Sequence, residues 1–343
     1  MSDQFDQSSV NGFILCGKFI PETALEILLS FVPVSDILKL RRVCQLWKDI
    51  VSRRSFWKEA FERNGLNWKA IPNNVKEKED AWIVLFCALK HRIFTKNFVR
   101  NHSGEAQFTH WEKLQDGGDR IIIESPPGGI SPLPINPDYA SGIESAFVTS
   151  YGWSTIRQKI DLKEAGLTPE VMKAMIPFQF VCTPMVGIRF DCAAMYCICL
   201  CLLDNKGKAV IYNISDGVHQ AGENWIQACC TLNVLQEPQH IKKVRHLAVI
   251  ISGKDNQFWA GHYGPKFSRI SVTAKCLTSE EAETVEPHRI HVRNQAVSDL
   301  FSMYGRRDFW NEMLPNAEAE AEEEESEESD DRVQRRTLNC SLF

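Results

Sequence analysis

Residues 19–57 read FIPETALEILLSFVPVSDILKLRRVCQLWKDIVSRRSFW, and this stretch decides the fold of the N-terminal part of the chain. Its first apolar residues recur at i, i+3, i+4 and i+7, which places them on one face of a helix. Pro21 stands near the start of this helix, where a missing N–H costs little, and Pro33 ends it. The residues of this first stripe are Leu25, Leu28, Leu29 and Val32.

Three more helices are predicted directly after it. Ser35 is placed to cap a short helix over 36–40, and Ser55 is placed to cap a later helix that Gly65 closes. Between them, a further apolar stripe predicts a helix of its own. The members of that stripe are Val43, Trp47, Ile50 and Val51.

A longer helix is predicted over 77–94, after a polar, proline-containing connector over 67–76. Its apolar face is formed by Trp82, Leu85, Phe86 and Leu89. The unit formed by the earlier helices, about 45 residues long, is too small to bury its apolar stripes well by itself. We therefore expect that unit to bind a partner.

This helical stretch resembles the F-box over its whole length. The resemblance rests on the leading Ile20-Pro21, on the paired leucines of the first helix, on Val43-Cys44 followed by Trp47, and on the aromatic pair Phe56-Trp57. It implies a complex with a Skp-type adaptor and, through that adaptor, with the cullin and RING subunits of a ubiquitin ligase. The candidate contacts in the adaptor's groove are Pro21, Leu25, Leu28, Val32, Leu38, Val43 and Trp47.

A generic helical hairpin, whose leucines and tryptophan only fill a core, is the alternative interpretation of this pattern. Some of the seven candidate residues must in any case hold the helices together. The sequence does not separate those residues from the ones that contact a partner.

From about Arg100 the apolar period changes to two, which is typical of strands. Strands are expected over 156–162, 178–182, 188–203, 208–213, 225–234, 244–251 and 267–275. Turn residues separate them, such as Asp204-Asn205-Lys206-Gly207. Many short strands with regular turn signals predict a sandwich or barrel, so the chain as a whole is expected to be α+β.

The second half of the chain resembles the F-box-associated domain of the sugar-recognising F-box subfamily, over about residues 97–275. The motifs that carry the resemblance are Asn97-Phe98-Val99-Arg100-Asn101-His102-Ser103-Gly104-Glu105, Trp111, Gly117-Gly118-Asp119, Ser150-Tyr151-Gly152-Trp153, Arg189-Phe190-Asp191-Cys192, Trp225 and Phe258-Trp259-Ala260-Gly261-His262-Tyr263-Gly264. The resemblance implies an antiparallel β-sandwich of the jelly-roll, galactose-binding-like kind.

Glycan-binding members of that subfamily hold the inner chitobiose of Asn-linked, high-mannose chains in loops at one end of the sandwich. The resemblance carries the aromatic pair of that site to Phe258 and Trp259, and an earlier loop aromatic to Tyr151. Ala260 stands where the subfamily has a lysine, so one hydrogen-bond donor is missing. A flat, polarisable platform suits the C–H face of a pyranose, whereas its hydroxyls need partners once desolvated.

Three functions follow from these two resemblances. The first is a substrate receptor of an SCF (Skp–cullin–F-box) ligase that recruits glycoproteins, including misfolded ones returned from the secretory pathway, for ubiquitination and proteasomal degradation. The second is a receptor whose sandwich binds a protein degron instead, with Ala260 as its motive. The third is a lectin-like protein that acts without the ligase. Burial of Phe258 and Trp259 as ordinary core residues remains open at this stage.

Composition excludes several other classes of protein. The longest apolar stretch, 193–203, is too short to span a bilayer, and 1–11 lacks the pattern of a secretory signal, so a cytoplasmic protein without membrane insertion is expected. The 12 cysteines are then expected to be reduced, and the alternating Cys197, Cys199 and Cys201 to be core residues and not metal ligands. The sequence has no clustered basic face of the kind that binds nucleic acid, and no catalytic motif of the kind that marks an enzyme. No cofactor is expected.

The expected domain boundaries follow from these patterns. They are a disordered 1–18, an F-box over 19–66, a helical linker over 67–96, the sandwich over 97–278, a partly helical extension over 279–315 with a helix around 292–304, and a disordered acidic tail over 316–343. Residues 317–331 contain ten acidic residues and no basic one. That run is either simply solvated or competes for a basic surface on a partner.

Overall fold

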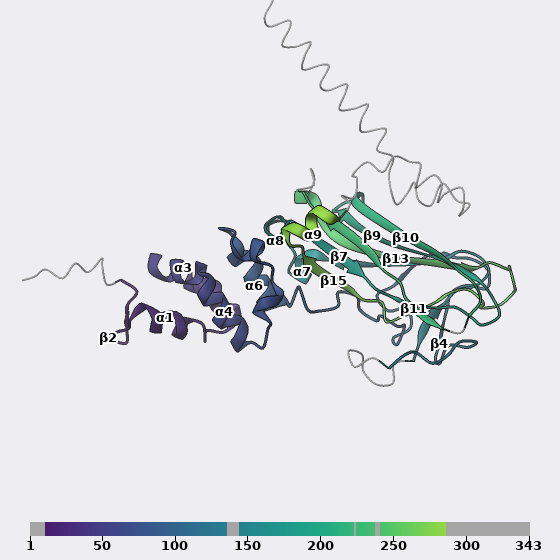
Figure 1. Cartoon of the computed structure of the whole chain (residues 1–343), viewed down its shortest axis with the longest axis horizontal. Coiled ribbons are helices and arrows are strands. Elements are labelled where there is room, and N and C mark those ends of the chain that lie inside the picture. The colour runs from purple at the N-terminus through teal and green to yellow at the C-terminus, as the bar shows by residue number, and fades with distance from the viewer. Residues whose placement is uncertain (1–10, 136–143, 223, 237–240, 286–343) are drawn as a thin grey trace, which may run out of the picture.

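The computed structural model describes residues 11–135, 144–222, 224–236 and 241–285. Helices form one end of the molecule and strands form the other, with α7, α8 and α9 gathered where the two parts meet (Figure 1). The helix expected around 292–304 and the acidic tail lie outside the described residues. Among the residues that the structure describes, every helix is too short or too polar to cross a lipid bilayer.

The helical part follows the predicted order, with different caps. Its elements are α1 Glu22–Leu29, η1 Val34–Asp36, α2 Ile37–Leu40, α3 Gln45–Ser52, α4 Arg54–Arg63, η2 Trp68–Ala70, α5 Asn73–Lys76 and α6 Ala81–His91. The two predicted serine caps are wrong: Ser35 lies inside η1, and Ser55 lies inside α4, whose N-cap is Arg53. Gly65 is confirmed just beyond the end of α4, with a left-handed φ of 67° that glycine adopts at low cost.

A short hairpin precedes these helices, within the segment that was expected to be disordered. Its strands are β1 Ile14–Leu15 and β2 Lys18–Phe19. Trp47 Nε1 donates a hydrogen bond to the carbonyl of Gly12 over 2.8 Å, which ties the hairpin to α3. The expectation of disorder is therefore corrected for residues 11–18, because the hairpin pairing and this tertiary contact order the segment.

Helix α6 joins the two parts of the molecule. It is shorter than the predicted 77–94, since Arg92 takes a left-handed φ of 57° and ends it. The helix packs against α3 and α4 on one side and against α8 (Pro169–Met175) on another. Its apolar residues are buried on nearly every side, as in a helix enclosed by protein. One core cluster consequently runs from the helices into the sandwich.

The strands form an antiparallel sandwich, as predicted. One layer is a sheet in the order β10-β9-β13-β6-β3. Its strands are β3 Glu112–Asp116, β6 Ser154–Asp161, β9 Ala194–Asp204, β10 Ala209–His219 and β13 Val244–Asp255. All its described pairings are antiparallel, and long registers such as β13 with β9 fix the inward face.

The opposite layer consists of two sheets in the orders β11-β8-β14-β5-β4 and β12-β7-β15. Their strands are β4 Ile122–Glu124, β5 Ala146–Val148, β7 Phe178–Cys182, β8 Met185–Gly187, β11 Trp225–Gln227, β12 Cys230–Val234, β14 Lys266–Ser268 and β15 Val272–Cys276. Each predicted run over 225–234 and 267–275 is thus split in two. Hydrogen bonds from Thr183 N to Ser271 O (2.8 Å) and from Ala228 N to Pro184 O (3.0 Å) carry the layer across the break.

Two short helices within the β segment escaped the sequence prediction. Helix α7 (Leu162–Ala165) begins at Asp161, whose side chain accepts from the Glu164 N–H, and α8 begins at Thr168. Both caps are visible in the sequence as Asp or Thr before a helical turn. The apolar pattern did not predict these helices because each is only one or two turns long.

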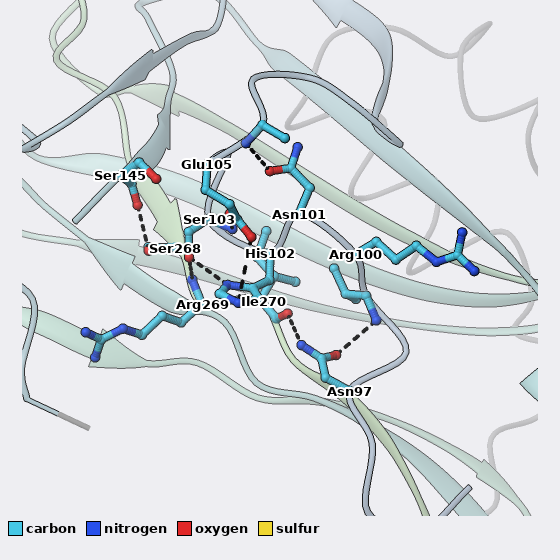
Figure 2. A network of polar contacts seen from close by, with 12 residues as sticks. Asn97, Arg100, Asn101, His102, Ser103, Glu105, Ser145, Ser268, Arg269 and Ile270 are labelled. Carbon is cyan, nitrogen blue, oxygen red and sulfur yellow. Dashed lines mark hydrogen bonds and ion pairs between the residues drawn. The ribbon is translucent and has the colours of Figure 1, made fainter. Parts of the chain in front are cut away.

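The opening segment of the sandwich is held by polar side chains, which Figure 2 shows from close by. The Asn97 side chain donates to the Ile270 carbonyl (3.0 Å) and accepts from the Val272 N–H (2.8 Å). Ser103 Oγ accepts a hydrogen bond from the N–H of Arg269 over 2.9 Å. Arg269 has a left-handed φ of 49°. These bonds explain why Asn and Ser occur at these positions: they add to the backbone bonds from Phe98 N to Val272 O and from Ile270 N to His102 O, both 2.9 Å.

Alternate residues of β9 serve opposite faces of the first layer. Ile198, Leu200 and Leu202 belong to the main core, whereas Cys199 and Cys201 belong to a second apolar cluster with Ala248 and Ile250. Every cysteine of the described ranges is a free thiol. Within those ranges, no group of three or more His, Cys, Asp or Glu could hold a metal ion.

Candidate functional site

The structure divides the seven candidate docking residues of the helical part by their exposure. Leu25 is fully buried at 0% exposure, so it holds the helices together and presents no surface to a partner. Leu28 is 47% exposed on the same helix. Pro21 and Val43 are also exposed, whereas Val32, Leu38 and Trp47 are half-buried.

Two further exposed residues of this surface were missed by sequence reasoning. Ile27 and Phe31 are exposed on and just beyond α1, at a spacing of four that brings their side chains together on a helical surface. Phe31 lies under the guanidinium of Arg63, whose Cζ is 3.6 Å from the ring centroid. Of the predicted stripe, Leu25 and Leu29 face inward and Leu28 faces outward. Ile27 and Phe31 lie beside that stripe and were not part of it. We call Ile27, Leu28, Phe31 and Val43 the docking face.

A second site lies at the end of β13 that is remote from the helices. Strand β13 starts after η3 (Ile241–Lys243), which packs on α8, and its length places Asp255 about 36 Å away. Asp255 Oδ1 accepts from the backbone N–H groups of Gln257 (3.0 Å) and Phe258 (2.6 Å). This turn holds Phe258 at a left-handed φ of 57°. The sequence Asp-Asn-Gln before the aromatic pair is a signal for such a turn.

The turn exposes both aromatic residues. Phe258 is 67% exposed and Trp259 is 43% exposed, so neither is a core residue. The Trp259 ring meets the Tyr263 ring edge-on at 5.5 Å between centroids. Ala260 is exposed next to them and offers no side-chain donor, as the sequence implies.

The loops that contain Asp119 and Ser150 hold the aromatic turn in place through hydrogen bonds. Ser150 O accepts from the Asp255 N–H (3.0 Å), and Ser150 Oγ donates to the Gly261 carbonyl (2.7 Å). Asp119 Oδ2 accepts from the Gly261 N–H (2.6 Å). Tyr151 directly follows Ser150 and is half-buried, so the structure brings the loop of Tyr151 beside the loop of Phe258 and Trp259. This convergence joins three motifs that lie far apart in the sequence.

Two cations that were not among the predicted site residues belong to this end of the sandwich, although Arg189 is part of a motif that carries the resemblance. The Lys254 ammonium lies 4.9 Å from the Phe258 ring centroid. The Arg189 guanidinium lies 4.4 Å from the Tyr263 centroid and forms two hydrogen bonds of 2.9 Å with Asp191. Those bonds raise the pKa of Arg189 and lower the pKa of Asp191, so both stay charged. Lys254 stands only four residues before Phe258 and reaches its ring through the local Asp255 turn, whereas Arg189 reaches Tyr263 from a distant part of the sequence.

We call Phe258, Trp259, Tyr263, Lys254 and Arg189 the aromatic end. It combines exposed rings, which suit an apolar ligand face, with charged donors within a few ångströms of them. Rings and charged donors in this arrangement suit noncovalent contacts with a ligand.

Comparisons with known proteins agree with both parts of the architecture. The F-box domain matches residues 20–59, and the F-box associated region matches residues 89–274. The chain belongs to the family of F-box proteins with an F-box associated region. Members of this family are non-catalytic adaptors.

Several curated relatives share this arrangement along most of their length. The chain is 30% identical to F-box only protein 6 of Bos taurus, over 74% of this chain and 91% of that protein. It is 26% identical to F-box only protein 17 of Homo sapiens, over 76% of this chain and 92% of that protein. Among solved structures, a complex of TmCBM61 with beta-1,4-galactotriose matches 53% of this chain and 99% of that chain at 10% identity, with a TM-score of 0.30. A score this low supports no functional conclusion.

Proposed function

We propose that this F-box protein is the substrate-recognition subunit of an SCF ubiquitin ligase that acts in the cytoplasm. The docking face supports the adaptor half of this proposal, because four large apolar side chains stand exposed on an otherwise well-packed helical unit. The Skp-type adaptor would cover them and connect the chain to the cullin and RING subunits. The catalytic steps of ubiquitin transfer would then belong to those other subunits.

The cargo half of the proposal is that the aromatic end binds Asn-linked, high-mannose glycans through their chitobiose core. The observation that carries it is the exposed pair Phe258 and Trp259, which the Asp255 turn presents to solvent. Large aromatic side chains are normally highly buried, so two adjacent exposed ones mark a binding surface. Lys254, whose ammonium lies 4.9 Å from the Phe258 ring centroid, would supply a hydrogen-bond donor to sugar hydroxyls.

A receptor for a protein degron is the second candidate. Ala260 favours it, because this position lacks the donor that the subfamily's glycan site uses. A lectin that acts without the ligase has less support, since residues 20–59 match the F-box.

The test is glycan binding by the full chain in complex with its adaptor. We expect chitobiose-core oligosaccharides to bind the wild type and not the Trp259→Ala variant, measured by calorimetry. The melting temperature of the variant should stay close to that of the wild type, because an exposed loop side chain contributes little to folding.

Phe19→Ala is the matched control, since Phe19 is an exposed aromatic residue at the other end of the molecule. If the wild type binds no glycan, or if Trp259→Ala binds as well as the wild type, the sandwich is not a glycan reader. Loss of binding together with a large drop in melting temperature would instead make Trp259 a structural residue.

A further inference from the structure

A basic cavity lies at the end of the sandwich that faces the helices, far from the aromatic end. Its volume is about 450 Å³, and it is formed by α7, the start of α8, η3 and the start of β13. The charged side chains in its wall are Lys163, Glu170, Lys242, Lys243 and Arg245. We call Lys163, Lys242 and Lys243 the lysine cluster.

The charges of this cavity are poorly balanced by its own surroundings. Arg245 pairs with Asp161 at 2.5 Å, and the Glu170 carboxylate accepts a hydrogen bond from Thr168, which lowers the pKa of Glu170. Within the described residues, no member of the lysine cluster forms an ion pair with a carboxylate. Three ammonium groups from two separate elements therefore line one cavity without an ion pair of their own, and Glu170 is the one carboxylate among the described residues of its wall.

The chain itself contains a segment of complementary charge. Residues 317–331 carry ten acidic residues and no basic one. No other segment of that length in the chain carries such a charge, and the described part offers it a concave surface of opposite sign. Attraction between several charges of each sign adds up where a single exposed pair contributes little.

The chain leaves the described region close to this cavity. The N–H of Leu277 donates to the carbonyl of Pro177 (2.9 Å), just after the end of α8, and α9 (Ser279–Thr284) follows directly. Helix α8 is about 10 Å long, and its first residues line the cavity. Thirty-one residues separate Val285 from Ala317, and a chain of that length can span at most about 100 Å. The acidic run can therefore reach the cavity of its own molecule.

We propose that residues 317–331 dock on the lysine cluster of the same chain. Tethering makes this association intramolecular, with an effective concentration on the order of millimolar, so even weak charge pairing occupies the cavity. The interaction weakens as salt screens the charges. An acidic segment of another protein would have to displace the acidic run before it could bind there. This inference does not depend on the ligase or glycan functions proposed above.

The test is zero-length carbodiimide cross-linking of the full chain, followed by digestion and mass spectrometry. At low salt we expect isopeptide bonds between carboxylates of 317–331 and each member of the lysine cluster. The decisive readout is the bond at Lys163 in the Lys242→Glu/Lys243→Glu variant. Lys163 is unchanged in that variant, so loss of its cross-link reports loss of docking and not loss of a reactive amine.

Lys48→Glu/Lys69→Glu is the matched control, because it reverses two exposed lysines of the helical part and changes the net charge equally. It should keep the Lys163 cross-link, and all such links should disappear at high salt. Mixing isotopically heavy and light chains separates links within one copy from links between two. The proposal is overturned if the wild type forms no such link, if the Lys242→Glu/Lys243→Glu variant retains it, or if the links join two copies.

Discussion

At the scale of single residues, Ala260 is the position where this chain departs from the glycan-binding pattern that it resembles. The structure shows an exposed alanine beside two exposed aromatic residues, with the Lys254 ammonium 4.9 Å from the Phe258 ring centroid. The sugar affinity that we propose for the aromatic end should therefore depend on how many charged donors reach it. One substitution can measure that dependence.

Ala260→Lys should tighten binding of a chitobiose-core glycan by about 1.5–3 kcal/mol, or about ten- to a hundredfold in Kd. The reason is a charge-assisted hydrogen bond to a desolvated hydroxyl. Calorimetry on the adaptor complex would measure it. Ala260→Met is the control, since it adds comparable length without the charge. Equal gains from both variants would mean that the lysine acts by apolar contact and that no donor is missing.

His102 gives a prediction about pH. Burial lowers its pKa most, Glu105 opposes this, and Arg269 lowers the pKa further. The folded protein therefore holds fewer protons than the unfolded chain below the ordinary histidine pKa of about 6.5. The contribution of His102 to the free energy of unfolding is therefore fully present above that pH. It is lost as the pH falls from there through the lowered pKa of the folded state. Burial lowers the pKa of His91 and His246 as well, so all three act in the same direction.

We expect the free energy of unfolding to decline between about pH 7 and about pH 5, and His102→Asn to make that decline shallower. Urea titrations at several pH values would measure it. His110→Asn, at an exposed histidine of the same segment, is the control for the loss of an imidazole. A His102→Asn variant with the wild-type slope would show that this histidine does not contribute to the acid sensitivity.

At the scale of elements, helix α1 serves two functions with its opposite sides. Leu25 and Leu29 face the core, whereas Ile27, Leu28 and the following Phe31 face solvent. All five are large apolar residues within two turns of helix, so apolar periodicity could not tell the sides apart. Packing against α4 decides which side is inside.

Leu28→Ala/Val43→Ala should weaken binding to the Skp-type adaptor while leaving the melting temperature nearly unchanged. Leu25→Ala should instead lower the free energy of unfolding by about 2–5 kcal/mol, because it leaves a cavity in the core. Adaptor affinity and thermal melts, measured on both variants, separate the two effects. Wild-type adaptor binding by Leu28→Ala/Val43→Ala would rule out the docking face.

At the scale of the whole molecule, α6 makes the helices and the sandwich one folded body. The Lys78 ammonium donates to the Ala174 carbonyl (2.9 Å), and the Asn74 side chain donates to the Leu277 carbonyl (2.9 Å). These bonds and the shared core cluster make residues 67–96 part of the folded sandwich, and not a free linker. The docking face and the aromatic end consequently stand at a fixed separation, which suits a receptor that must hold cargo at one end and a ligase at the other.

A fragment over residues 67–285 should therefore melt at a clearly higher temperature than one over residues 95–285. The shorter fragment loses the apolar surface of α6 that covers α8, together with the hydrogen bonds from Lys78 and Asn74. Calorimetric melts of both fragments provide the comparison. Equal melting temperatures would show that the sandwich needs nothing from the linker helices.

The sequence by itself determined the main helices and strands, the α+β class and both family resemblances, because helical and strand periods are local properties of the chain. It also pointed to Phe258, Trp259 and Ala260 through the motif that contains them. Only the tertiary structure decided which side of α1 is buried, since that depends on packing against α4. The same holds for the meeting of Arg189 with Tyr263 and of Lys163 with Lys242. Such groupings arise from strand register and from elements that are far apart in sequence, and no local pattern records them.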